Sequence, residues 1–284
     1  MPIVRRSALA LAAVLAAALP SAASAEPNYV ALGDSYVAGP VIPLQIKPWG
    51  CLKSDHNYAH LAAPELGLDL RDPSCSGAET EDMTQPQGVS PRPNPPQFDK
   101  LGVDTEVVTL GIGGNDIGFS SLAEDCFNAG VNDRTGSPCK DMYTAGGTDQ
   151  ISQRIAETAP KVAANLQGIQ TRSPGARIFV VNYPAIFPHE GPGCYAILPV
   201  AEGDVVWLRE KQQELNQMLA DQAAAHGATI VDWYSASRGH DACQLPGIKW
   251  VEGAVPANAA APVHPNLLGM MGAEQVLVAA VNGG

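Results

Sequence analysis

The chain has few basic residues and only one long apolar run, and both shortages exclude classes of function. Its 284 residues include 17 Lys and Arg against 29 Asp and Glu, which gives a net charge of −12. An acidic protein without Lys/Arg runs is unsuited to binding nucleic acid or anionic membrane surfaces. No second long apolar segment follows the first 25 residues. We therefore expect a soluble protein with no nucleic-acid partner and no membrane span.

Sequence motifs of several cofactor and metal proteins are also missing. None of the cysteines forms the C-x-x-C pair typical of zinc sites and thioredoxin-like redox sites. Gly111 and Gly113 follow an apolar run, but Asp116 stands where a dinucleotide-binding fingerprint needs its third glycine. Val37 likewise takes the last position of a G-x-S-x-G elbow around Ser35. There is no Walker sequence and no metal-ligand set, so we expect neither cofactor nor metal.

The first 25 residues have the pattern of a secretory signal peptide. Arg5 and Arg6 precede an apolar run over residues 8–19, and Ala23-Ser24-Ala25 has the A-x-A form of a cleavage site. The apolar run is about a dozen residues, too short for a membrane span. The alternative is an uncleaved N-terminal anchor. We predict a cleaved signal over residues 1–25 and a secreted mature chain, one domain, over residues 26–284.

Short apolar runs alternate with longer helical segments along the mature chain. The predicted strands cover residues 29–32, 68–71, 105–110, 177–182 and 229–232, and the predicted helices cover residues 57–66, 151–171, 204–226 and 267–281. Such alternation is typical of βαβ units and a parallel sheet. Residues 41–51, 85–97 and 120–149 do not fit it and are predicted to be loops, the last of them functional or a lid.

Six cysteines remain in the mature chain, an even count that favours three disulfides in an exported protein. Six cysteines allow fifteen pairings. The hypothesis preferred here is sequential pairing, which requires only that each bridge close one loop between neighbouring elements: Cys51–Cys75, Cys126–Cys139 and Cys194–Cys243.

Ser35 lies in the tight turn that follows the first predicted strand. A hydroxyl at the carboxyl end of a strand lies where open α/β sheets bind their ligands, but it needs a base and oxyanion donors. His264 is the best candidate base of six histidines, because prolines on both sides fix its backbone just before the last helix. Gly77 and Asn115 lie in two glycine-containing turns that could supply the donors.

Taken together, these residues resemble the GDSL family, also called SGNH hydrolases. The resemblance rests on Gly33-Asp-Ser35, Gly77, Gly114-x-Asp116 and His264, in this order over most of the mature chain. The chain is most similar to the secreted actinobacterial lipases and esterases of the family, which carry six sequentially paired cysteines and a stretch like Gly239 to Cys243. The resemblance implies a three-layer α/β/α fold with a mostly parallel sheet of about five strands in the flavodoxin-like order 2-1-3-4-5.

The resemblance also implies roles for individual residues. Ser35 would be the nucleophile and His264 the general base, while the Ser35 N–H, the Gly77 N–H and the Asn115 amide would form the oxyanion hole. Many members place an Asp three residues before the histidine, but that position is Ala261 here. Some members of the secreted subgroup use a main-chain carbonyl instead, here that of Ala261 or Pro262. We favour this Ser–His dyad over a triad completed by Asp241.

The predicted reaction is hydrolysis of a carboxylic ester through an acyl-enzyme by a monomeric protein. Its partner would be a small-molecule or lipid ester, with a carbohydrate acetyl ester as the alternative. An apolar loop over residues 42–49 lies close to Ser35 in sequence and either lines an acyl pocket or simply packs beside its disulfide. A different class of function is a secreted binding protein of the same fold with an inactive site, although Ser35, Asn115 and His264 are all present.

Overall fold

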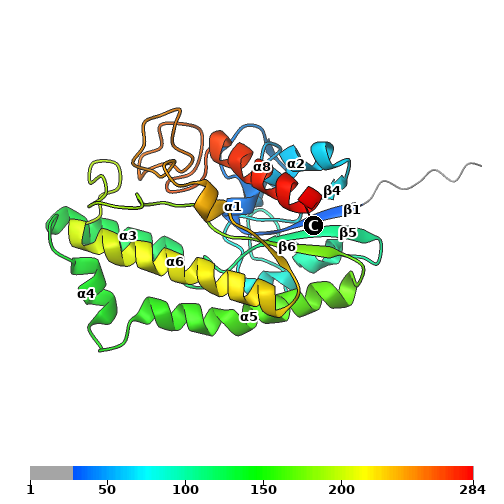
Figure 1. Ribbon diagram of the computed structural model, residues 1–284, viewed down its shortest axis with the longest axis horizontal. Coiled ribbons are helices and arrows are strands. Elements are labelled where there is room, and N and C mark those ends of the chain that lie inside the picture. The colour runs from blue at the N-terminus through cyan, green and yellow to red at the C-terminus, as the bar shows by residue number, and fades with distance from the viewer. Residues whose placement is uncertain (1–27, 284) are drawn as a thin grey trace, which may run out of the picture.

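A five-stranded parallel sheet forms the centre of the computed structural model, which describes residues 28–283 (Figure 1). Its strands are β1 (Asn28–Gly33), β4 (Asp69–Arg71), β5 (Thr105–Gly111), β6 (Arg177–Val181) and β7 (Thr229–Val231). They lie in the order β4-β1-β5-β6-β7, and each neighbouring pair is parallel. This is the predicted 2-1-3-4-5 order, with β4 as the predicted edge strand. The predicted signal peptide over residues 1–25 lies outside the described residues.

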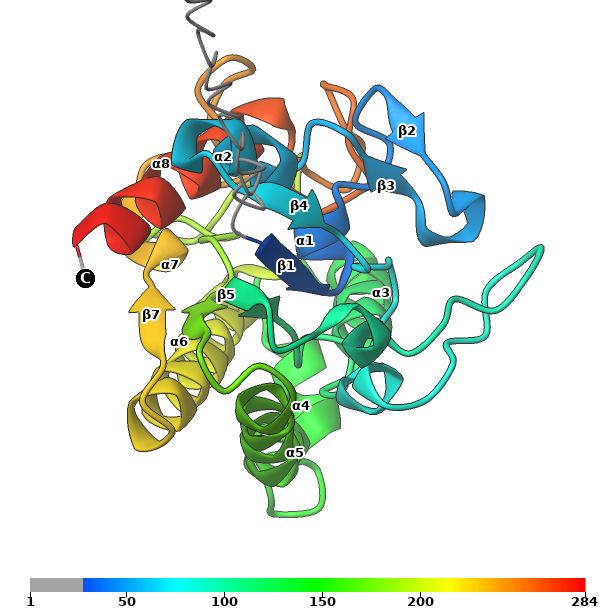
Figure 2. The same ribbon diagram turned by 90° about the vertical axis from the view of Figure 1, so that its right-hand side faces the viewer.

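Helices cover both faces of the sheet and make a three-layer α/β/α sandwich (Figure 2). Helices α2 (Tyr58–Leu66) and α8 (Leu267–Gly283) pack together on one face. Helices α5 (Gln150–Arg172) and α6 (Glu202–Ala225) pack together on the other. The sheet is therefore shielded from water on both sides, and its strands can be continuously apolar. The predicted fold class is confirmed.

The shorter elements lie mostly in the connections. They are α1 (Ser35–Ala38), α7 (Trp233–Ala236), a hairpin of β2 (Gln45–Ile46) and β3 (Lys53–Ser54), and three 3₁₀ turns, η1 (Trp49–Cys51), η2 (Thr80–Met83) and η3 (Gln97–Lys100). Among residues 28–283, no helix is long and apolar enough to cross a membrane.

The prediction of a loop over residues 120–149 is wrong, because most of this segment is helical. It forms α3 (Phe119–Asn132) and α4 (Pro138–Thr144). Helix α3 buries Leu122, Cys126 and Gly130, which are four residues apart and share one face. Only one of these three has a large apolar side chain, so the apolar stripe is too weak to recognise in the sequence.

All six cysteines are paired in the structure. The bonds join Cys51 to Cys75, Cys126 to Cys139 and Cys194 to Cys243, which is the sequential order. The second bond joins α3 to α4 and ties this helical excursion into the core. The third joins two loops that lie 49 residues apart in sequence.

Candidate active site

Ser35 lies where strand β1 ends at the carboxyl edge of the sheet. It is the first residue of α1, and the preceding Asp34 caps this short helix by accepting a 2.8 Å hydrogen bond from the Tyr36 N–H. The Ser35 side chain is thereby placed at the edge where open α/β sheets bind their ligands. The position agrees with the expectation from the sequence.

The turn that carries Ser35 is held by hydrogen bonds to two neighbouring segments. The Asp34 N–H donates to the Gly111 carbonyl on β5 over 3.1 Å. The Gln97 amide donates to the Gly33 carbonyl over 2.9 Å and accepts from the Gly33 N–H over 2.8 Å. A Cβ at Gly33 would collide with Val37 and with the Gly111 carbonyl, so only glycine allows this close approach.

His264 faces Ser35 across the chain, 229 residues away in sequence. Its Nε2 lies 2.8 Å from the Ser35 Oγ, and its Nδ1 lies 2.7 Å from the Pro262 carbonyl oxygen. A carbonyl can only accept, so Nδ1 carries the proton and the Nε2 of the neutral ring is free to accept from the Ser35 hydroxyl. Burial lowers the pKa of His264, although the hydrogen bond to Pro262 opposes this shift. The neutral ring that a general base requires is therefore favoured.

The loop around His264 rests on a buried carboxylate that the sequence gives no reason to single out. Glu252 is fully buried and accepts hydrogen bonds from Asn258 and Asn266, each over 2.7 Å, and from Lys249 over 2.9 Å. Burial alone would raise its pKa, but these hydrogen bonds outweigh it and lower the pKa of Glu252 to about 2. The Glu252 N–H also donates to the His264 carbonyl over 2.9 Å.

Tyr36 links the nucleophile turn to the histidine loop. Its hydroxyl donates a 2.6 Å hydrogen bond to the Val263 carbonyl, and its ring lies 4.9 Å from that of His264. Val263 has a φ of 59°, a left-handed conformation that is unfavourable for a β-branched residue. The Tyr36 hydroxyl therefore helps to hold a strained residue directly before His264.

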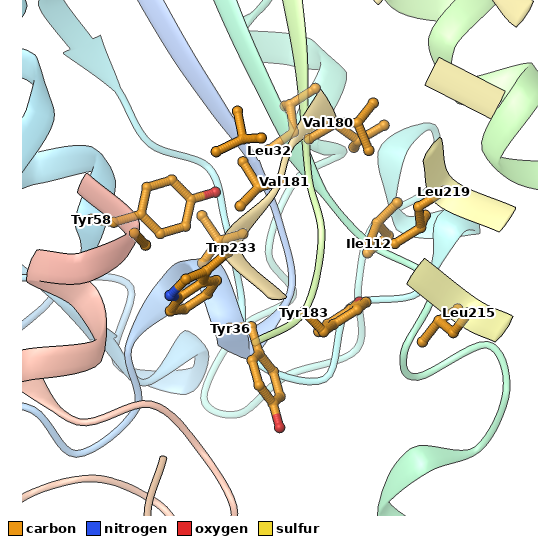
Figure 3. Close-up of a cluster of buried hydrophobic side chains, with 14 of the residues drawn as sticks. Leu32, Tyr36, Tyr58, Ile112, Val180, Val181, Tyr183, Leu215, Leu219 and Trp233 are labelled. Atoms are coloured by element: carbon orange, nitrogen blue, oxygen red, sulfur yellow. The ribbon is translucent and has the colours of Figure 1, made fainter. Parts of the chain in front are cut away.

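Tyr183 makes a second link, toward the turn that contains Asn115. Its hydroxyl donates to Asp34 over 2.6 Å and accepts from the Gly114 N–H over 2.8 Å. Burial raises the pKa of Asp34 to about 7, against the hydrogen bonds from Tyr183 and Tyr36. Figure 3 shows Tyr36 and Tyr183 side by side, and their rings meet edge to face at 5.1 Å.

The three candidate oxyanion donors belong to turns that the fold joins. Gly77 has a φ of 81°, which explains the glycine. The Asn115 amide donates over 2.8 Å to the carbonyl of Ala78, the residue next to Gly77, and the amide has a second hydrogen to offer. Within residues 28–283, neither the Ser35 N–H nor the Gly77 N–H has a hydrogen-bond partner. Both are therefore available to a substrate oxygen.

Asp241, the other candidate partner for His264, is committed to its own turn. Its carboxylate accepts from the Cys243 N–H and from the Gln244 amide, each over 3.0 Å. The neighbouring His240 stacks on Trp250 and bonds to the Ile248 carbonyl. The stretch from Gly239 to Cys243 therefore shapes a loop, and the Nδ1 of His264 bonds to the Pro262 carbonyl, one of the two predicted orienters.

A deep apolar cavity opens beside Ser35 and His264. Helices α3 and α6 and the segment after β6 supply most of its walls, with side chains that include Leu122, Phe127, Ile186, Phe187, Leu208 and Leu215. Lys211 also borders the cavity, but its ammonium group is paired with Asp149 and Glu214. The loop over residues 42–49 is absent from the cavity walls among the described residues. Of the two alternatives for this loop, packing beside its disulfide is therefore favoured over lining an acyl pocket.

Sequence reasoning missed Tyr36, Tyr183 and Glu252. A signal existed for Tyr183, which lies two residues after the end of strand β6 and so had to lie near the carboxyl edge of the sheet. Tyr36 adjoins Ser35, but its contact with Val263 spans 227 residues and has no local signature. Glu252 lies in an irregular segment, where nothing in the local pattern predicts a fully buried carboxylate.

The strand order, the three layers and the serine at the carboxyl edge of the sheet are those of SGNH hydrolases. The chain matches the GDSL-like lipase/acylhydrolase family over residues 31–271. It is also 42% identical over 268 residues to Lipase 2 of Streptomyces coelicolor, an alignment that covers 92% of this chain and 88% of that protein. The chain therefore belongs to the GDSL-like lipase/acylhydrolase family and is a carboxylic ester hydrolase.

Solved structures of similar proteins agree with the fold. An extracellular lipase from Streptomyces rimosus superposes with a TM-score of 0.73 at 26% identity, covering 89% of this chain and 99% of that one. A phospholipase A1 from Streptomyces albidoflavus superposes with a TM-score of 0.75 at 24% identity, covering 90% and 100%. At that identity the second likeness shows the fold alone.

Proposed function

We propose that the protein is a secreted serine esterase or lipase that works through a Ser35–His264 dyad. The observation that carries this proposal is the 2.8 Å contact between the Ser35 Oγ and a His264 ring whose Nδ1 is bonded to a backbone carbonyl. That arrangement gives the ring the correct tautomer without a carboxylate. Secretion is supported by the predicted signal peptide and by three disulfides, which persist in oxidising compartments.

In the first half of the reaction, the Nε2 of His264 takes the Ser35 proton while the Oγ attacks the ester carbonyl carbon. The oxyanion that forms would accept hydrogen bonds from the Ser35 N–H, the Gly77 N–H and the Asn115 amide. His264 then donates its proton to the alcohol oxygen, and the alcohol leaves. In the second half, His264 takes a proton from water as the water oxygen attacks the acyl carbon. His264 then returns this proton to the Ser35 Oγ as the bond between the Oγ and the acyl carbon breaks and the acid leaves.

The apolar cavity supports an acyl or lipid ester as substrate. Its walls contain many aliphatic and aromatic side chains, and Lys211, the one Lys or Arg among the described residues that line it, is neutralised by two carboxylates. Burying methylene groups contributes about 0.8 kcal/mol each, so a longer acyl chain gains affinity for as long as the cavity accepts it. A carbohydrate acetyl ester would leave most of these walls without contact.

Two measurements test this function. A fluorophosphonate probe should label the native protein and fail to label Ser35→Ala, whereas equal labelling of both would contradict the assignment of Ser35. Values of kcat/KM for p-nitrophenyl esters from acetate to palmitate should rise beyond acetate. A sharp optimum at acetate would favour a carbohydrate acetyl esterase, and no hydrolysis together with no labelling would favour a binding protein.

A further inference from the structure

A surface groove adjoins the apolar cavity at His264. Its walls are formed by one side of α3 and by the loop before His264, and the residues are Phe119, Ser120, Ala123, Glu124, Phe127, Asn128, Pro262, Val263 and His264. Several of these residues, His264 among them, also line the cavity. The two hollows therefore meet at the proposed general base.

Helix geometry explains how α3 serves both hollows. Ser120, Glu124 and Asn128 are four residues apart, so they share one face of α3, and all three are exposed. The helix turns its buried side, including Leu122, toward the cavity. The α3 wall of the groove therefore carries polar side chains beside the apolar Phe119, Ala123 and Phe127, while the cavity side of the helix is apolar.

If Ser35 and His264 act as proposed above, the positions of the cavity and the groove indicate where the acyl part and the alcohol part of an ester bind. The acyl part suits the apolar cavity. The alcohol oxygen must come within reach of the Nε2 of His264, because that atom gives the oxygen its proton. The rest of the alcohol then extends into the groove, which shares His264 with the cavity and has polar side chains to solvate a hydroxyl-rich or charged group.

The charge of the groove favours some alcohols over others. Glu124 is the one charged side chain among the described residues that line it, and within residues 28–283 it forms no ion pair. A lone carboxylate repels an anion, and no Lys or Arg of the groove offsets this repulsion. We propose that the groove binds the alcohol part of the ester and that Glu124 makes the enzyme discriminate against anionic alcohols in favour of neutral and cationic ones.

Three butyrate esters with matched leaving groups test this specificity: neutral phenyl butyrate, anionic 3-(butyryloxy)benzoate and cationic 3-(butyryloxy)-N,N,N-trimethylanilinium. In Glu124→Gln, the cation-to-anion ratio of kcat/KM should fall about fivefold from the native ratio, as expected for one partly screened charge nearby. In Glu124→Lys it should fall further. In each variant, kcat/KM for the neutral ester is the reference to which the values for the two charged esters are normalised.

Glu106→Gln is the matched control, because Glu106 is exposed on β5 and its loss changes the net charge equally. This variant should keep the native ratio. An unchanged ratio in Glu124→Gln, or an equal fall in Glu106→Gln, would overturn the proposal. Failure of the native enzyme to hydrolyse the neutral ester would instead contradict the proposed function, so the two failures are distinguishable.

Discussion

The nucleophile and the histidine are held in different ways. Ser35 follows a central strand, and its turn is fixed by backbone groups of β1 and β5 and by Gln97. His264 lies in an irregular segment whose pairing is limited, among the described residues, to an isolated bridge between Val251 and Pro265. That segment has a few irregular backbone hydrogen bonds, such as that from the Glu252 N–H to the His264 carbonyl. It depends in addition on side chains: the buried Glu252 with its partners, and Tyr36 from α1.

The serine and the histidine therefore differ in how sensitive their positions are to substitutions elsewhere in the protein. Backbone hydrogen bonds of a sheet form with almost any side chain, so the position of Ser35 follows from the fold itself. The position of His264 depends on a few polar side chains as well as on backbone hydrogen bonds, and each of these side chains can be removed by one substitution. We therefore expect substitutions remote from the reacting atoms to disturb the histidine more than the serine.

The largest effect should come from removing the base itself. His264→Ala should reduce kcat for a p-nitrophenyl ester by about 10⁴- to 10⁶-fold, because no other group takes the Ser35 proton. The matched control is His226→Ala at the end of α6, where the ring bonds to the Gln222 carbonyl and to Gln167 of α5. A loss of less than about tenfold in His264→Ala would contradict the dyad.

The next largest effect should come from removing the carboxylate of Glu252, whose hydrogen bonds hold the histidine loop. Glu252→Gln leaves the buried Lys249 without its carboxylate, and breaking a buried ion pair in this way costs about 3–5 kcal/mol. We expect a lower free energy of unfolding, measured with urea, and lower activity. Glu214→Gln, which removes a more exposed partner of Lys211, is the control and should cost less.

The pH dependence of the stability lost in Glu252→Gln follows from the lowered pKa of Glu252. Its folded value of about 2 lies below its ordinary value of about 4.5, so ionised Glu252 stabilises the protein above pH 4.5. This contribution is lost as the pH falls from about 4.5 toward 2. The difference in unfolding free energy between native protein and Glu252→Gln should therefore shrink over this range, and a constant difference would contradict the assignment.

The same contrast explains how much the sequence could predict. All five strands and the helices α2, α5, α6 and α8 were predictable, because βαβ units have a strong local periodicity. Ser35, Gly77 and Asn115 were predictable as a group, because each follows or adjoins a strand end and the carboxyl ends of parallel strands meet at one edge. Where the ends of strands place the site residues, the local sequence pattern is sufficient.

The supports of His264 and the walls of the cavity were not predictable in this way. Glu252 and Tyr36 reach the histidine loop through tertiary contacts that leave no local pattern. Residues 42–49 adjoin Ser35 in sequence, but the cavity is built by α3 and α6, which approach Ser35 only in the folded chain. Helix α3 was not recognised in the sequence because its apolar stripe is weak.

A smaller effect should come from removing the Tyr36 hydroxyl, which links the nucleophile turn to the histidine loop. Tyr36→Phe keeps the ring beside His264 but removes the hydrogen bond to the Val263 carbonyl, so the strained residue loses a partner. We expect kcat to fall about tenfold with KM nearly unchanged. The acid limb of the pH profile, which should lie below pH 6.5 because burial lowers the pKa of His264, should move as the ring shifts.

Tyr143→Phe is the matched control for that substitution. Tyr143 is as buried as Tyr36, at 6% exposure, and its hydroxyl donates one 2.7 Å hydrogen bond, to Asp125. It should lower stability by about 1 kcal/mol and leave kcat and the acid limb in place. If both variants behaved alike, Tyr36 would be a packing residue and the histidine loop would not depend on it.

The smallest effect should come from Asp241, and it tests directly whether the position of His264 depends on a further side chain. A side-chain carboxylate partner for His264 would make the histidine region dependent on one more residue, whereas the Pro262 carbonyl that bonds its Nδ1 belongs to the backbone. Because Asp241 bonds within its own turn, Asp241→Asn should leave kcat within about twofold while removing up to about 1 kcal/mol of stability. A loss near 10⁴-fold, the scale seen when a triad carboxylate is removed, would show that the orienting group is Asp241 and that the backbone carbonyl is insufficient.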